Sequence, residues 1–129
     1  MKLYQEELMD HYRFPHNKGQ LEKPDFNSGH HNPSCGDSIQ LQGCIYKGIL
    51  TSIAFEGKGC VISQAAASML TQEVKNKDIT QILTFDASFM CALLGIELGP
   101  MRLQCALLSL QALHQGIFSY QQNQESKNA

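Results

Sequence analysis

Four side chains in this sequence are candidate ligands of a single metal site: the thiols of Cys35, Cys60 and Cys105 and the carboxylate of Asp37. Cys35 and Asp37 stand two residues apart in segment 32–37, Asn-Pro-Ser-Cys-Gly-Asp, where the glycine lets the backbone turn without a Cβ clash. Both side chains can then point to one side, provided that the next strand starts only after Asp37. We therefore expect the four groups to converge on one site.

The two later cysteines are expected beside the first turns of helices. Cys60 precedes a helix expected over residues 62–75, and Cys105 lies early in a helix that begins at Pro100, close to Arg102. The dipole and free N–H groups of a helix N-terminus favour an ionised thiol. Three thiolates and one carboxylate suit tetrahedral Zn²⁺ or iron, and also a [2Fe–2S] cluster, which normally takes four thiolates. Because oxygen matches cluster iron less well than sulfur, a cluster held there should be labile.

The first half of the chain predicts a helix, a loop and a hairpin. Residues 3–12 have helical apolar spacing that ends before Pro15. Residues 13–34 hold three prolines and predict an ordered surface loop, mobile around residues 28–31. The apolar period then changes to two, with a turn at Lys47-Gly48. Two antiparallel strands and a short third strand are predicted over residues 38–46, 49–56 and 57–59.

The second half of the chain predicts helices. Three are expected over residues 62–75, 79–83 and 87–94. Their expected N-caps are Ser63, Asp78 and Asp86. The last helix begins at Pro100, and its polar tail from Gln121 is expected to be frayed. Strands grouped before helices favour an α+β fold. We expect one domain over residues 1–129, with helices on one face of a small antiparallel sheet of two to three strands and a long C-terminal helix.

The composition narrows the class of protein. The chain has 129 residues, 43% of them hydrophobic, and a formal net charge of −2, so nucleic acid is not an expected partner. Its five cysteines are odd in number and form no Cys-x-x-Cys pair, which argues against a disulfide framework and a zinc ribbon. We expect no signal peptide and no membrane segment, and therefore a cytoplasmic protein.

Other candidate residues receive weaker assignments. Packing is the expected role of two further cysteines, Cys44 and Cys91. A solvated surface pair is favoured over metal ligation for His30 and His31. A nearby cation offsets the negative charge of an anionic ligand set. Lys58 and Arg102 could each play this auxiliary role near the ligands. A simple solvated surface charge is an equally favoured interpretation of both residues.

Several longer motifs carry a resemblance to a known family. The segments are Asp-His-Tyr (10–12), Pro-x-Asn-x-Gly (15–19), Asn-Pro-Ser-Cys-Gly-Asp (32–37), Phe-Glu-Gly-Lys-Gly-Cys-Val-Ile-Ser (55–63), Ala-Ser-Met (67–69) and Pro-Met-Arg-Leu-Gln-Cys-Ala (100–106). With them the sequence resembles the U-type iron–sulfur cluster scaffolds, namely IscU, SufU and the N-terminal domain of NifU. The resemblance covers nearly the whole chain.

The resemblance implies a cluster-assembly scaffold without an active-site reaction of its own. It implies that Cys35, Cys60 and Cys105 are the scaffold cysteines and that Asp37 is the fourth ligand. Such proteins take sulfur from a cysteine desulfurase, build a transient [2Fe–2S] cluster and pass it to apo-proteins, and isolated members hold Zn²⁺ or Fe²⁺. Two alternatives stay open: a zinc-bound, SufU-like acceptor of persulfide sulfur, and a purely structural zinc domain.

The sequence also departs from each branch of that family. The sequence motif around Cys60 resembles that of SufU. However, the segment between Cys60 and Cys105 is too short to contain the insertion that SufU-type members carry there. The chaperone-binding motif Leu-Pro-Pro-Val-Lys of IscU is replaced by Leu-Gly-Pro-Met-Arg at residues 98–102, so chaperone docking is not implied. Gln104 stands where IscU has a histidine.

Overall fold

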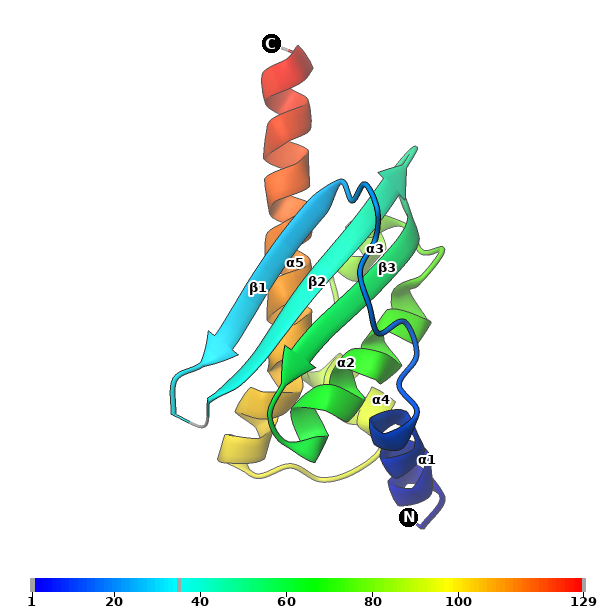
Figure 1. Ribbon diagram of the computed structural model, residues 1–129, viewed down its shortest axis with the longest axis vertical. Coiled ribbons are helices and arrows are strands. Elements are labelled where there is room, and N and C mark those ends of the chain that lie inside the picture. The colour runs from blue at the N-terminus through cyan, green and yellow to red at the C-terminus, as the bar shows by residue number, and fades with distance from the viewer. Residues whose placement is uncertain (1, 35, 129) are drawn as a thin grey trace.

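The computed structural model describes residues 2–34 and 36–128, and these form a three-stranded antiparallel sheet with helices against one face (Figure 1). Its strand order is β1-β2-β3, the order of the chain. The elements are α1 (Lys2–Arg13), β1 (Phe26–Asn32), β2 (Asp37–Tyr46), β3 (Ile49–Lys58), α2 (Val61–Val74), α3 (Ile79–Ile82), α4 (Ala87–Leu94) and α5 (Pro100–Asn128). The expected α+β architecture with a long last helix is confirmed.

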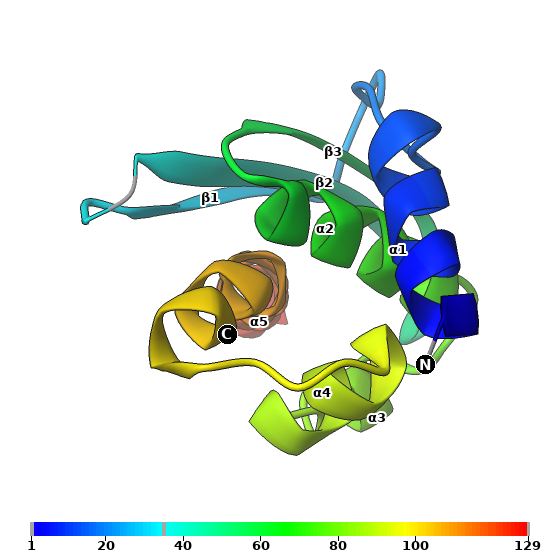
Figure 2. The same cartoon turned by 90° about the horizontal axis from the view of Figure 1, so that it is seen from below.

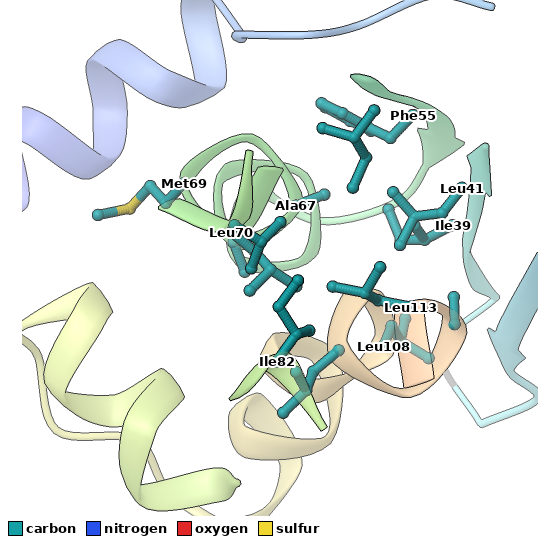
Figure 3. Close-up of a cluster of buried hydrophobic side chains, with 14 of the residues drawn as sticks. Ile39, Leu41, Phe55, Ala67, Met69, Leu70, Ile82, Leu108 and Leu113 are labelled. Atoms are coloured by element: carbon teal, nitrogen blue, oxygen red, sulfur yellow. The ribbon is translucent and has the colours of Figure 1, made fainter. Parts of the chain in front are cut away.

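Figure 2 shows the layers: the sheet lies above α2 and α5, and α1 lies beside α2. Alternation in the strands produces this arrangement, because Ile39, Leu41 and Phe55 all point to the helical side and are at most 1% exposed. They meet Leu70 of α2 and Leu113 of α5 in the core (Figure 3). Full burial of each such side chain stabilises the fold by about 1.5–3 kcal/mol.

Strand β1 corrects two expectations about the sheet. Residues 26–32 were expected in a loop that is mobile around residues 28–31, but they form strand β1. The third strand was expected around residues 57–59, but residues 57 and 58 instead extend β3. The sequence did not predict β1 because this edge strand is mainly polar and lacks the alternation of apolar residues that indicates a strand. Phe26 anchors β1 in the core, where its ring lies so close to α5 that a Cβ at Gly116 would come within 2.3 Å of it.

The helix boundaries follow the local chemistry in most places. Asp78 and Asp86 cap α3 and α4 through their carboxylates, as expected, and α5 begins at Pro100. The polar tail from Gln121 does not fray but continues α5 to Asn128, because this stretch contains good helix formers and no glycine or proline. No helix in the described ranges is long and apolar enough to cross a membrane.

A buried polar contact fastens α1 to α2. His11 Nδ1 lies 2.7 Å from Ser68 Oγ, which also accepts the His16 backbone N–H at 2.7 Å. Burial lowers the pKa of His11, and the neighbouring His16 lowers it further, while Glu7 and Asp10 raise it by less. His11 is therefore neutral at physiological pH and holds α1 through a neutral hydrogen bond.

Candidate metal centre

The antiparallel hairpin of β2 and β3, together with the start of α5, brings three of the four predicted ligands to one end of the sheet. Asp37 begins β2 next to the end of β3, where Ser38 pairs with Lys58, and α2 starts directly after Cys60. The first turns of α5, which carry Cys105, lie at the same end (Figure 1). A carboxylate oxygen of Asp37 and the thiols of Cys60 and Cys105 all lie within 4.8 Å of one another. This is a distance at which three atoms can share one cation.

Asp37 is held as a buried carboxylate with one oxygen left over. It is 3% exposed, and its Oδ1 accepts the Cys60 backbone N–H at 3.1 Å. Its Oδ2 is buried and has no hydrogen-bond partner within the described residues. Such an oxygen is costly unless another group compensates it, so a cation at this position is favoured.

The pKa of Asp37 reflects two opposing effects. Burial raises it, but the thiols of Cys60 and Cys105, the Cys60 backbone N–H and Ser63 outweigh burial, and the net pKa lies below the usual value. The carboxylate is therefore ionised at neutral pH and offers an anionic ligand. Strand β2 begins at Asp37 itself rather than after it, which corrects the expected strand start.

Cys60 is the N-cap of α2, and Ser63, the expected cap, supports it. The Cys60 Sγ accepts the Ser63 backbone N–H at 3.5 Å, and the Ser63 Oγ donates to the Cys60 carbonyl at 3.1 Å. Cys60 is exposed, whereas Ser63 is fully buried. The helix start thus fixes the direction of an accessible thiol.

Gly59 is needed because of the carboxylate beside it. Its φ is +138°, and a Cβ on this residue would lie 2.2 Å from Asp37 Oδ1. The glycine therefore both permits the backbone conformation before α2 and leaves room for Asp37.

An open, mostly apolar cavity of about 570 Å³ adjoins Cys60 and Cys105. Its apolar walls come from α1, α2 and α5 and include Leu8, Met9, Val61, Ile62 and Met101. Met101 is 75% exposed at the cavity rim. Arg102 is the one charged residue among the described residues that line the cavity. A protein partner could therefore reach the thiols across apolar surface.

Other predicted residues lie elsewhere. Cys35 falls outside the described residues, so its position in the site stays a prediction. The group of candidate ligands, Asp37, Cys60 and Cys105, contains neither Cys44 nor Cys91, both of which are half-buried. The Cys44 Sγ donates to the Lys23 carbonyl at 3.6 Å. His30 and His31 are also outside this group, and Lys58 lines a different hollow, on the other face of the sheet.

Asn32 also contributes to the site, although its place in segment 32–37 predicted no separate role for it. It is 9% exposed; its Oδ1 accepts the Ser34 backbone N–H at 3.0 Å, and its Nδ2 donates to Gln104 Oε1 at 3.4 Å. Asn32 thus shapes the start of segment 32–37 and links it to α5. The available signal was an asparagine at the start of a proline-containing turn.

Taken together, an ionised buried carboxylate and two thiols form a cluster of oxygen and sulfur donors at one end of the sheet, with a spacing that could hold a metal ion. A family model described as the NifU-like N terminal domain matches residues 3–127. The chain therefore belongs to this family of iron–sulfur cluster assembly scaffolds.

Individual relatives lie on both branches of the family. The zinc-dependent sulfurtransferase SufU of Bacillus subtilis is 38% identical, with 89% of each chain covered. The iron–sulfur cluster assembly scaffold protein IscU of Haemophilus influenzae is 34% identical and covers 94% of this chain and 98% of its own. A solved structure of a putative SUF-system scaffold from Fervidobacterium islandicum has a TM-score of 0.75 at 23% identity, covers 90% of this chain and 97% of its own, and supports the fold.

Proposed function

We propose that this protein is a scaffold on which a labile [2Fe–2S] cluster is assembled and from which the cluster is transferred to apo-proteins. The observation that carries the proposal is the buried Asp37 carboxylate: one of its oxygens lies within 4.8 Å of the Cys60 and Cys105 thiols, and its Oδ2 lacks a hydrogen-bond partner among the described residues. We assign Cys35 as the fourth ligand, on the family resemblance and its closeness in sequence to Asp37.

The donor set supports release as well as binding. Three thiolates hold cluster iron firmly, whereas a carboxylate oxygen is a poorer match for iron in a cluster. The exposed Cys60 and the open apolar cavity give partners access to the cargo. In this proposal a cysteine desulfurase delivers sulfur to the thiols, and acceptor apo-proteins later approach from the same side. The protein supplies ligands and orientation and is not itself an enzyme.

The similarity to the SufU of Bacillus subtilis favours a second candidate function. Here Zn²⁺ would occupy the site, and one thiol would accept persulfide sulfur from the desulfurase without cluster formation. Asp37, Cys60 and Cys105 suit Zn²⁺ as well as iron, since zinc accepts thiolate and carboxylate ligands in tetrahedral sites.

One reconstitution separates the two functions. The protein is purified without oxygen, its iron, zinc and sulfide are measured, and a desulfurase, cysteine and ferrous iron are added. Charge-transfer absorption that develops and then moves to an apo-ferredoxin supports the scaffold. Persulfide on one cysteine with zinc retained and no chromophore supports the acceptor instead. Wild-type metal content in both Cys60→Ala and Cys105→Ala would contradict the ligand assignment in either case.

A further inference from the structure

A second hollow, of about 560 Å³, lies on the sheet face that the helices leave uncovered. Six of its lining residues form two cross-strand rows, because the register aligns His31, Ser38 and Lys58 in one row and Gly29, Gln40 and Glu56 in the other. The alternate residues Ile39 and Leu41 point into the core, so these rows face away from α2 and α5. This face points toward the viewer in Figure 1, with α5 behind it. We call the site the outer-face hollow.

The floor of the outer-face hollow is shaped by a missing side chain. A Cβ on Gly29 would lie 2.6 Å from Gln40 Oε1, so the Gln40 side chain occupies the space above this glycine. Gln40 Nε2 donates to Asn27 Oδ1, which holds the amide in place across the strands. The hydrogen-bonded Gln40 side chain therefore forms part of the floor of this shallow hollow.

The charge of the outer-face hollow is opposite to that of the whole chain. Lys18 and Lys58 flank it, although the formal net charge of the chain is −2. The one ion pair within the described residues is elsewhere on the protein, so neither lysine is neutralised by a described carboxylate. The only carboxylate at the hollow, Glu56, accepts a hydrogen bond from Gln20 Nε2 at 3.2 Å. Two lysines without an ion-pair partner among the described residues therefore line the hollow, together with the imidazole of His31.

We propose that the outer-face hollow binds an acidic segment of a partner protein, whose carboxylates contact Lys18 and Lys58. The volume falls in the range of about 300–1,000 Å³ that is usual for binding sites, and the hollow crosses all three strands, which suits an extended peptide. Its described lining residues lie in strands, apart from Lys18 in a loop, so no helix N-terminus is present to favour a compact phosphate group.

The position of the hollow links it to the metal centre without sharing residues. Ser38 follows Asp37 directly, and Lys58 lies two residues before Cys60, so both sites are at the same end of the sheet but on opposite faces. A partner that holds its acidic segment in the hollow can reach round this end toward the thiols. The inference goes beyond the proposed function and holds whichever metal or cluster the site carries.

The test measures binding of a fluorescein-labelled hexaglutamate peptide to the full-length protein by anisotropy at low ionic strength. Binding should be absent for hexaglutamine and should weaken with added salt. Because exposed charge pairs contribute about 0.2–1 kcal/mol, Lys18→Gln and Lys58→Gln should each weaken binding about one-and-a-half- to fivefold. Lys75→Gln is the matched control, since it changes an exposed lysine at the far end of α2. Amide NMR shifts on titration should concentrate at Gly29, Ser38 and Gln40.

Each other outcome overturns the proposal. If hexaglutamate does not bind detectably, the proposal is wrong. If Lys75→Gln weakens binding as much as Lys18→Gln and Lys58→Gln do, the peptide binds through general surface charge and not in the hollow. If inorganic phosphate displaces the peptide at equal concentration and shifts the same amides, the hollow is a small-anion site instead. None of these readouts depends on cluster assembly, so failure here leaves the proposed scaffold function untouched, and loss of the scaffold function leaves this proposal standing.

Discussion

Replacing Gly59 by alanine should damage the metal centre by displacing Asp37. The new methyl group would lie 2.2 Å from Asp37 Oδ1 and 2.4 Å from its Cγ, and the carboxylate is buried with little room to move. Overpacking of this kind costs about 1–3 kcal/mol. The φ of +138° adds a backbone penalty of about 1–3 kcal/mol for any residue with a Cβ. The unfolding free energy should therefore fall by about 2–6 kcal/mol in total.

Gly19→Ala provides a control that pays only the backbone penalty. Gly19 has a nearly identical φ of +143°, and a Cβ there would meet nothing within 4 Å. The difference between the two variants in urea unfolding should isolate the clash, about 1–3 kcal/mol. Since metal binding needs the carboxylate back in place, the Zn²⁺ affinity of Gly59→Ala, from competition with a chelator, should fall about 5- to 150-fold. Gly19→Ala should bind Zn²⁺ like the wild type.

The contact with Asp37 can be tested by coupling the two positions. In an Asp37→Gly background the clashing atoms are gone, so Gly59→Ala should cost no more than Gly19→Ala does. This comparison also serves if Gly59→Ala alone is too unstable to study. Our reasoning is refuted if Gly59→Ala is no more destabilising than Gly19→Ala and retains wild-type Zn²⁺ affinity.

Three further predictions address the ligands and α1. Asp37→Ala should lengthen the half-life of the assembled cluster, followed by its absorption under chelator challenge; faster loss would contradict the lability argument. Cys105→Ala should lower Zn²⁺ affinity more than about tenfold, since even indirect partners of metal ligands cost 10–100-fold, whereas Cys91→Ala should retain it. Because burial lowers the pKa of His11 below 6.5, the unfolded state binds the extra proton first as pH falls. The unfolding free energy should therefore decline below pH 6.5 and level off below the folded pKa, with a smaller slope in His11→Gln in urea melts; equal slopes would refute the assignment.

The spacing of apolar residues and the helix-capping residues predicted β2, β3 and the helices. This was possible because both signals depend on residues that are close together in the sequence. Alternation along residues 38–46 is enough to direct Ile39 and Leu41 to one side of a strand. Asp78 and Asp86 cap helices through backbone groups two or three residues away. The motifs around Asp37, Cys60 and Cys105 likewise predicted that these donors meet, and they lie within 4.8 Å.

Strand β1 and the outer-face hollow could not be predicted in this way. β1 contains mainly polar residues, and its pairing with β2 and its contact at Gly116 involve residues distant in the sequence. Lys58 was considered as a cation for the metal centre while the strand was expected to stop at residue 56. Because β3 continues to Lys58, the two-residue alternation turns this side chain to the opposite face.

The sequence by itself determined which atoms can bind metal in this protein, since a thiol or a carboxylate is a property of the residue. Only the tertiary structure decided how they are held. It buries Asp37 with one unpartnered oxygen in the described structure, makes Cys60 the cap of α2, and requires glycine at position 59. The physical reason is that burial and clearance arise where β2, α2 and α5 meet, and no local segment contains all three contacts.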